Sequence, residues 1–379
     1  MFGVRLARRK LMTLAAMALV AGCAVVPKPR PEERPPERPG SSLPADLQRH
    51  RVALLVPLGG ANAAVGQAIA NAATMALLDT NASNIRITTY DTSTGVQAAA
   101  SRAISDGNRL ILGPLLSDEI APVAAAARSS RVPVISFSND EEAAAPGVYV
   151  MGNLPGQSIG RTVSYARSLK AGRFAALIPS GEYGQRAAAS LSQAVGAAGG
   201  TLVGTEGYDR GNTSAISAAQ RLRGKGRFDA VLIADGGRIA AQAAASLKSA
   251  MPGVRILGTE LWSGDGAVAT TPALRGALFS TVSDTRFRQF SESYKARFGA
   301  APHRIATLGY DGVLLTIRLA RDWKPGTTLP TGRLADGSAF LGVDGAFRFR
   351  PDGVIERALE VREVRAGGVT VVSPAPAGF

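Results

Sequence analysis

Short apolar runs alternate along most of the chain with longer segments whose apolar residues recur at helical spacing. The runs at 51–58 and 132–137 are continuous, which is typical of strands buried on both faces of a parallel sheet. The segment 64–79 is rich in helix-forming residues and has the helical period. This pattern predicts an α/β protein with strands at 51–58, 84–91, 109–113, 132–137, 174–179, 201–208, 229–235, 254–258 and 276–282.

A break at 147–156, with three glycines and a proline, divides the alternation into two runs. Two such runs predict two doubly wound parallel-sheet lobes with right-handed crossovers. The tail is too short for a third domain, so it is expected to complete the lobes through several hinge crossovers around a central cleft. The expected boundaries are 51–152 with 284–340 for one lobe, and 153–283 with 341–379 for the other.

The N-terminus has the pattern of a secretion signal, with four basic residues between positions 5 and 10 and an apolar run at 11–20. The alternative is a transmembrane anchor, but 11–26 supplies only 16 residues, against about 20 needed to span a bilayer. The ending Val-Ala-Gly-Cys resembles the bacterial lipobox, which implies cleavage before Cys23 and lipidation of its thiol. Residues 1–22 are therefore expected to be a lipoprotein signal peptide.

Cys23 is the only cysteine in the chain, which excludes a disulfide, a free catalytic thiol and a cysteine-based metal site in the mature domain. The proline-rich stretch 26–40 predicts a semi-rigid extended tether, so residues 23–50 are expected to hold the domain away from a membrane. A proline-motif ligand for a partner is the alternative. Ala24 follows the cysteine, and by the enteric sorting rule the absence of Asp there implies the outer membrane.

Composition excludes several classes of function. Hydrophobic residues make up 46 % of the 379 residues, which fits a globular protein. The net charge of +14 raises the possibility of a nucleic-acid or anionic-membrane partner, but the basic residues are scattered and are not interleaved with aromatics. Only two histidines occur, and no metal-ligand spacing, nucleophile elbow or phosphate-binding loop is found. We therefore expect a non-enzymatic protein without metal or cofactor and without a nucleic-acid partner.

Six motifs in order carry a family resemblance: VALLVPLGGANAAVGQAIANAATMAL, ILGPLLSDEIAPVA with RVPVISFSND, FAALIPSGEYGQ, ILGTELWSG, FSESYKARFGAAPHRIATLGYDGV and LGVDGAFRFRPDG. Together they resemble the type I periplasmic-binding-protein fold, specifically leucine-binding-protein domains, over about residues 50–375. The lipobox, the tether and the GPLLSDE motif resemble those of a branch of lipoproteins that includes activators of penicillin-binding proteins.

The resemblance implies a ligand site between the lobes. In amino-acid-binding relatives, first-lobe donors hold the ligand α-carboxylate, and a second-lobe carboxylate holds the ammonium group. Carried over by motif, Ser117 is the first-lobe hydroxyl, and Ser138 and Asp140 form the second binding turn. Tyr183 falls on a cleft aromatic and Glu260 on the ammonium-binding carboxylate. Asp140 stands where a hydroxyl is common.

Other positions depart from the family pattern. The chain is aliphatic near Val65, where an aromatic is usual, and Asp235 replaces a second-lobe aromatic. Asp118 and Glu119 add negative charge beside Ser117, so a ligand carboxylate there would be repelled.

Simpler structural roles also fit the site residues. Ser117 is a preferred type of N-cap residue, which would put Pro122 five positions later, where it removes a backbone donor. Alternatively the helix begins later, with Pro122 in its first turn, and the amides at 115–119 are left for binding. Tyr183 could simply start a helix, and Glu260 could be a solvated loop acid.

Two functions remain open from the sequence. The first is a lipid-anchored periplasmic solute-binding protein that captures an amino acid or similar small polar ligand for an ABC permease. The alternative is a lipoprotein activator of a penicillin-binding protein, using the same fold as an interaction scaffold in the regulation of peptidoglycan synthesis. Ser117, Tyr183 and Glu260 favour solute binding, which we place first. The missing aromatics, the acidic turn and the tether favour the alternative.

The lipobox interpretation makes a direct prediction about the mature N-terminus. The wild-type chain is expected to begin at a lipidated Cys23, and Cys23→Ser to accumulate as an uncleaved precursor, because the thiol is the acceptor. Mass spectrometry of membrane-extracted protein measures both. An unmodified Cys23, or an intact signal on the wild-type chain, would contradict the assignment.

Overall fold

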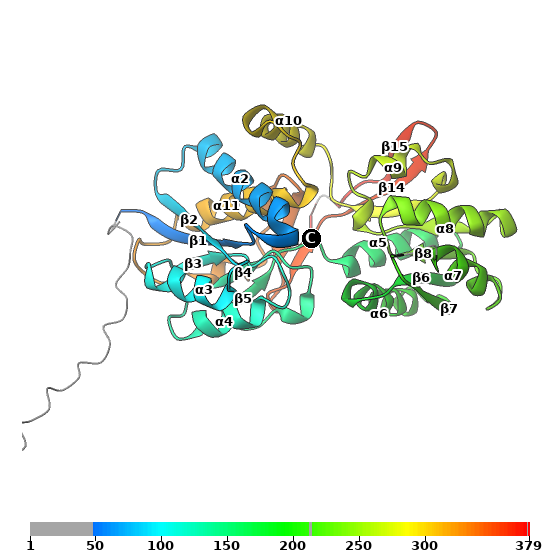
Figure 1. Ribbon diagram of the computed structural model, residues 1–379, viewed down its shortest axis with the longest axis horizontal. Helices are drawn as coiled ribbons and strands as arrows, with labels where there is room; N and C mark the ends of the chain where they lie inside the picture. The colour runs from blue at the N-terminus through cyan, green and yellow to red at the C-terminus, as the bar shows by residue number, and fades with distance from the viewer. Residues whose placement is uncertain (1–47, 212–213, 377) are drawn as a thin grey trace, which may run out of the picture. The chain divides into compact units, whose positions relative to one another are not determined.

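The computed structural model describes residues 48–211, 214–376 and 378–379 (Figure 1). The predicted signal at 1–22, the lipidation site Cys23 and the tether at 26–40 lie outside these residues. Within the described part, every helix is too short or too polar to cross a membrane. The described elements form two β/α lobes, which we call lobe I and lobe II.

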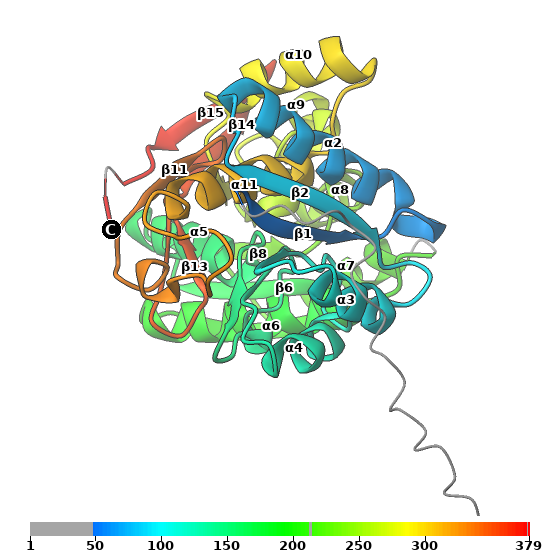
Figure 2. The same cartoon turned by 90° about the vertical axis from the view of Figure 1, so that its left-hand side faces the viewer.

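Lobe I is built on a parallel sheet with the strand order β2-β1-β3-β4-β5. The continuous apolar run of β1 is fully buried from Val52 to Val56, as its pattern predicts. Two helices cover each face of the sheet, α2 with α11 and α3 with α4 (Figure 2). The elements are β1 (His50–Val56), α2 (Ala63–Thr80), β2 (Ile85–Asp91), α3 (Val96–Ser105), β3 (Leu110–Leu112), α4 (Ile120–Arg128), β4 (Val134–Ser136), β5 (Val148–Val150) and α11 (Thr307–Leu319).

Lobe II has the sheet order β15-β14-β10-β9-β8-β6-β7. Strands β6 to β10 run parallel, and β14 pairs antiparallel with both β10 and β15. Helices α5 and α6 pack on one side, and α7, α8 and α9 on the other. The elements are α5 (Pro155–Ser168), β6 (Arg173–Pro179), α6 (Glu182–Ala197), β7 (Thr201–Tyr208), α7 (Ser214–Arg223), β8 (Ala230–Ile233), α8 (Gly237–Ala250), β9 (Arg255–Leu257), α9 (Gly266–Thr270), β10 (Leu278–Thr281), β14 (Glu360–Arg365) and β15 (Gly368–Ser373).

Both parallel sheets reverse their strand order beside the first strand of the lobe, between β1 and β3 and between β6 and β8. Ligands of open α/β sheets bind outside the carboxyl ends of the strands at such reversal points. The loops that follow β3, β4, β6 and β9 leave these carboxyl ends. The five residues that the family resemblance nominates for ligand binding lie in these loops or at the start of the helix that follows, as Tyr183 does in α6.

The chain passes between the lobes three times, at 151–154, at 282–286 and at 358–359, which confirms the predicted multiple crossovers. Helix α10 (Phe287–Phe298) follows the second passage. A small antiparallel sheet of β11 (Phe340–Gly342), β12 (Gly345–Phe349) and β13 (Ile355–Arg357) precedes the third. Its side chains Phe347 and Phe349 belong to the lobe I core. The expected boundary at residue 340 stays a prediction, and we propose to place it near residue 358 instead.

The break expected at 147–156 contains a short strand, and a helix that was not expected follows it. Strand β5 has only three residues, beside glycines that suggested a turn. Helix α5 contains two glycines and several Ser and Thr residues, so its propensity is weak. Pro155 at its first turn is the one local signal that marks the start.

The contact between α2 and α11 predicts a steric requirement at Gly309. A Cβ at this position would lie 2.3 Å from the backbone oxygen of Ile69. Gly309→Ala is therefore expected to lower the free energy of unfolding by about 1–3 kcal/mol through overpacking. The matched control is Gly160→Ala in α5, where an added Cβ meets no atom within 4 Å, and where alanine should stabilise the helix by up to ~1 kcal/mol. Urea unfolding measures both, and equal effects would contradict the assignment.

Candidate functional site

The GPLLSDE segment connects β3 to α4. Gly113 has φ +95°, and a Cβ there would lie 2.2 Å from the backbone oxygen of Leu55, so only glycine fits this turn. Helix α4 begins at Ile120 with Pro122 in its first turn, which confirms the later of the two helix starts considered above. The N-cap position is occupied by Glu119, so Ser117 is not the cap.

Ser117 instead contacts the other lobe. Its hydroxyl donates to a carboxylate oxygen of Glu182, the first residue of α6, at 3.3 Å. The turn predicted to hold a ligand carboxylate therefore touches a protein carboxylate in this structure.

A second contact between the lobes lies nearby. Arg186 of α6 donates to Asp140 at 2.9 Å and to the side chain of Asn139 at 3.3 Å. The same guanidinium pairs with Glu182 at 3.1 Å. We call the residues Ser117, Asn139, Asp140, Glu182 and Arg186 the lobe clamp. Side chains of lobe II thus form hydrogen bonds with two of the predicted binding residues of lobe I, Ser117 and Asp140.

Ser138 is buried at 3 % exposure beside the clamp. Its hydroxyl oxygen accepts the backbone N–H of Asp140 at 3.2 Å. Its own backbone N–H donates to the hydroxyl of Ser136 at 3.1 Å. Ser138 therefore shapes the turn that presents Asp140 to Arg186.

Tyr183 and Glu260 come together in lobe II. The Tyr183 hydroxyl lies 2.9 Å from Glu260 Oε1 and 2.9 Å from Thr259 Oγ1. Glu260 opens a short 3-10 helix, Glu260–Trp262, directly after β9, and Thr259 caps it. Tyr183 lies in the first turn of α6, as the helix-start alternative expects. Its contact with Glu260 shows that Glu260 is not a solvated loop acid.

The second carboxylate oxygen of Glu260, Oε2, is buried and has no hydrogen-bond partner among the described residues. Burial raises the pKa of Glu260 to about 7, and the hydrogen bond from Tyr183 offsets part of this rise. Burial and the Glu260 charge also raise the pKa of Tyr183. A carboxyl group with such a pKa can change its charge near neutral pH.

Glu260 lines a cavity of about 40 Å³ that all three lobe connections border, through Asn153, Val282 and Leu359. We call it the hinge cavity. At roughly 10–15 Å³ per water, it has room for only a few water molecules in this arrangement of the lobes. Pockets for drug-sized ligands occupy about 300–1,000 Å³, so a larger molecule requires the lobes to move apart.

Unpartnered polar atoms converge on the hinge cavity. Besides Glu260 Oε2, the atoms without a hydrogen-bond partner are the acceptor Asn153 Oδ1 and the donors Arg304 Nη2, Arg357 Nε and Arg357 Nη1. Arg304 Nη2 has only a long ion-pair contact, with Asp284 at 3.9 Å. Arg357 is only 6 % exposed, and its remaining nitrogen donates to the Met151 backbone oxygen at 2.8 Å. Unpaired buried polar groups are costly. Their concentration in one cavity therefore marks it as a candidate site for a small charged or zwitterionic group.

A model of the periplasmic binding protein family matches residues 50–369 of the chain. The chain belongs to this family. The uncharacterized protein RP748 of Rickettsia prowazekii is 30 % identical over 172 residues, which are 45 % of this chain and 46 % of that protein. The matched part thus spans about half the length of this curated relative.

Solved structures agree with the family assignment. A Rhodospirillum rubrum protein described provisionally as a branched-chain amino acid ABC transporter has a TM-score of 0.75 at 21 % identity, covering 86 % of this chain and 100 % of that one. The branched-chain amino acid transporter substrate-binding protein LivJ of Streptococcus pneumoniae, in complex with isoleucine, has a TM-score of 0.64 at 21 % identity, covering 86 % and 100 %. At these identities the structures show the fold alone.

The family assignment confirms the predicted type I fold with two α/β lobes. Periplasmic binding proteins bind solutes and are not enzymes, so this chain is a binding protein of the periplasm. The roles of the five nominated residues stay predictions.

A buried ionic cluster lies behind the hinge cavity of this periplasmic binding protein. Arg304 pairs with Asp344, which also accepts a hydrogen bond from Thr307 at 2.8 Å. Asp311 accepts the backbone N–H of Val343. Burial and the Asp344 charge raise the pKa of Asp311. These carboxylates partly balance the arginine charges of the cavity.

Asp235, which replaces a family aromatic, also has a structural role. It accepts hydrogen bonds from the Tyr208 hydroxyl at 2.8 Å and from Arg210 at 2.9 Å. Arg210 in turn lies 5.9 Å from the centre of the Tyr183 ring. Asp235 therefore orients the side chains behind Tyr183.

Sequence reasoning missed Arg186, Arg304 and Arg357. Arg304 lies within a motif that carried the family resemblance, but nothing local separates these three from the other basic residues of a strongly basic chain. In the described part of the chain, no group of three or more His, Cys, Asp or Glu side chains is arranged to hold a metal ion.

The raised pKa of Glu260 predicts a pH-dependent stability. The ordinary glutamate pKa of 4.5 applies to the unfolded chain, and the folded value is about 7. The unfolded state therefore releases this proton first as pH rises, so the stability that protonated Glu260 contributes is lost between about pH 4.5 and 7. The loss amounts to at most about 3 kcal/mol.

Glu260→Gln removes this titration, so the difference in unfolding free energy between variant and wild type should move in favour of the variant as pH rises from 5 to 8. Urea unfolding at several pH values measures this difference, in which the contribution of Asp311 cancels. Parallel curves for the two proteins would show that Glu260 does not titrate in this range.

Proposed function

We propose that the chain is a lipid-anchored solute-binding protein that captures an amino acid or similar small polar molecule between its lobes for an ABC permease. The observation that carries the proposal is the hinge cavity, where Glu260 Oε2, Arg304 Nη2 and two nitrogens of Arg357 lack hydrogen-bond partners. An ammonium group complements the carboxylate, and a ligand carboxylate complements the guanidinium groups.

Ligand entry requires the lobes to rotate apart about their three connections, a common motion in two-lobed binding proteins. This motion breaks the contact between Ser117 and Glu182 and the ion pair between Asp140 and Arg186. A ligand carboxylate then competes with Asp140 for Arg186. Tyr183, which already holds Glu260, is expected to pack against the ligand.

Ser117, Ser138, Asp140, Tyr183 and Glu260 therefore stay our proposed ligand-binding residues, with Arg186, Arg304 and Arg357 added. We do not expect the ligand to be isoleucine. The guanidinium groups favour a ligand with an additional acidic group over one with an aliphatic side chain. Lipidation at Cys23 would hold the protein at the periplasmic face of the envelope, with the outer membrane favoured. The proposal requires no cofactor, metal or nucleic acid.

The lobe clamp favours a second candidate function, activation of a penicillin-binding protein. The clamp joins the lobes through protein side chains alone, with Arg186 paired to both Asp140 and Glu182. A protein that closes without ligand can present one fixed surface to a partner. In that case the fold serves as a scaffold and the hinge cavity holds only water.

Ligand binding separates the two candidates. A thermal-shift screen of the mature wild-type protein against amino acids, dicarboxylic amino acids and muropeptides should find a stabilising compound. A ligand at a hundredfold excess over Kd stabilises the folded state by about 2.7 kcal/mol. The shift should fall sharply in Glu260→Gln and in Tyr183→Phe, because both weaken the same ammonium site.

Glu142→Gln is the matched control, since this exposed carboxylate of lobe I forms no hydrogen bond or ion pair through its side chain in the described part of the chain. It should bind as the wild type does. A screen without any stabilising compound, together with stimulation of a purified penicillin-binding protein, would overturn the transport proposal in favour of the scaffold.

A further inference from the structure

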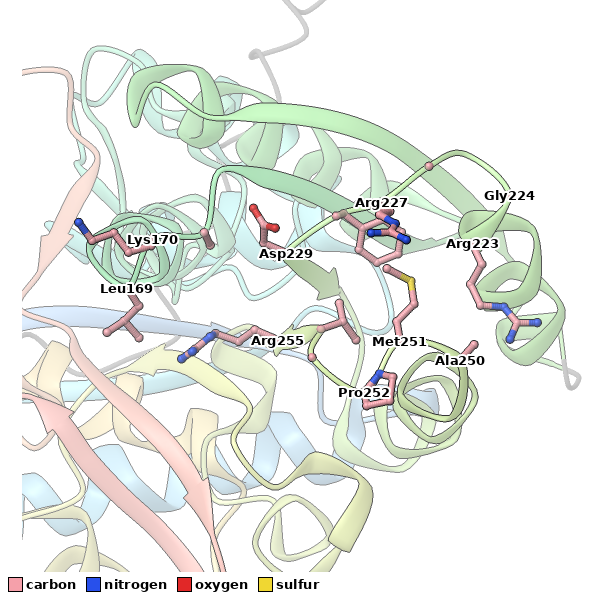
Figure 3. Close-up of a pocket in the computed structure, with 15 residues that line it drawn as sticks. Leu169, Lys170, Arg223, Gly224, Arg227, Asp229, Ala250, Met251, Pro252 and Arg255 are labelled. Carbon is pink, nitrogen blue, oxygen red and sulfur yellow. The ribbon is translucent and has the colours of Figure 1, made fainter.

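A wide concavity lies in lobe II at the edge of the sheet where β6, β8 and β9 begin (Figure 3). Because these strands are parallel, this edge is opposite to the one that carries Glu260. The concavity has a volume of about 950 Å³, against about 40 Å³ for the hinge cavity. It is large enough to accept several side chains of another molecule, and we call it the basal concavity.

Four cationic side chains line the basal concavity: Lys170, Arg223, Arg227 and Arg255 (Figure 3). None of them forms an ion pair or a side-chain hydrogen bond within the described part of the chain. By contrast, the nearby cations Arg221 and Lys225 both pair with Glu206 at 2.8 Å.

One carboxylate, Asp229, belongs to the lining, and it is already engaged. Its Oδ2 accepts the backbone N–H groups of Gly172 and Arg173 at 2.7 and 2.8 Å, which fixes the start of β6. The four cations therefore have no neutralising group in the lining. Clustered like charges in a concave surface raise the local concentration of anions.

The floor of the concavity is apolar. Phe228 and Val254 line it and are only 4 % and 5 % exposed. Met251 also lines it and is half-buried. Pro252 and Leu169 are exposed at its border. Apolar lining with a few charged groups at the rim is typical of sites that bind a ligand with both apolar and charged parts.

We propose that the basal concavity is a docking site for an acidic peptide segment of a partner protein, with carboxylates at the four cations and one apolar side chain over Met251 and Phe228. Charge complementarity carries the choice of an anionic occupant. A bilayer surface is flat on this scale and does not reach the recessed floor. A free phosphate or dicarboxylate leaves most of the volume and the whole apolar floor uncovered.

This docking site is independent of ligand capture. The basal concavity contains no residue of the hinge cavity or the lobe clamp. A partner bound there leaves the lobes free to open and close. The proposal therefore holds for either candidate function, and its test does not involve Glu260.

Fluorescence polarisation at low ionic strength tests the proposal with the mature full chain. The probe is a fluorescein-labelled peptide of Glu residues with one central Phe, and a second peptide has Ser in place of Phe. The charge-reversal pair Arg227→Glu and Arg255→Glu should weaken binding of the first peptide at least ~10-fold, because like charges then face each other. The Ser peptide should bind the wild type more weakly than the Phe peptide.

The matched control is the pair Arg288→Glu and Arg321→Glu, exposed arginines outside the concavity with no side-chain partner in the described part of the chain. It changes the net charge equally and should reduce binding far less. Circular dichroism and thermal unfolding check that both double variants are folded, and Arg227→Ala with Arg255→Ala provides a milder test if the reversal does not fold.

Equal losses in the two double variants would show that binding follows net charge alone, and this result would overturn the site. So would equal binding of the Phe and Ser peptides. Binding to phosphatidylglycerol vesicles that is lost in the basal variant, without peptide binding, would identify a membrane surface as the occupant and overturn the peptide proposal. Displacement of the probe by inorganic phosphate alone at micromolar concentration would overturn it as well, because a small anion would then be the preferred occupant.

Discussion

The burial of Arg357 where the three lobe connections meet is the constraint on which the rest of the hinge depends. A buried guanidinium is costly unless carboxylates and hydrogen bonds compensate it. Here one nitrogen of Arg357 donates a hydrogen bond to the backbone oxygen of Met151. Burial lowers the pKa of Arg357, and the negative charges of Asp344 and Asp311 offset part of this effect. The ionic cluster behind the cavity is arranged around this charge. Any motion of the lobes must therefore keep the groups that stabilise the buried Arg357 charge, or provide other groups in their place.

This constraint connects the hinge to ligand capture. The free nitrogens of Arg357 and Arg304 and the free oxygen of Glu260 belong to the same cavity, although they come from three separate parts of the chain. A stable protein core normally satisfies such groups. In the hinge cavity these groups are not satisfied, and the pKa of Glu260 lies near neutrality. Such a combination favours a functional role. Under the proposed function, this small cavity is the closed form of a larger site.

Much of the fold was predictable because its signals are local. Continuous apolar runs such as that of β1 indicate buried parallel strands, and the alternation with helices indicates the lobes. The short strand β5 and the glycine-containing helix α5 were missed because tertiary packing, not propensity, forms them. At the site, motif resemblance nominated both Tyr183 and Glu260, whose side chains are hydrogen-bonded in the structure, while their roles in binding stay predictions. Asp140, the cross-lobe partner of Arg186, lies 46 residues away in sequence, and Asp344 lies 40 residues from Arg304, and such pairings have no local pattern.

Magnitudes favour ligand capture over a permanently closed scaffold. The pair of Arg186 with Asp140 is partly exposed, with side-chain exposures of 24 % and 19 %, and pairs near the surface contribute about 0–1 kcal/mol. Since about 1.4 kcal/mol corresponds to a tenfold change in an equilibrium, this ion pair by itself favours closure by less than about tenfold. A ligand that pairs the free groups of the hinge cavity would contribute more, because those groups are buried. Lobes that close weakly alone and firmly around a ligand are what capture and release require.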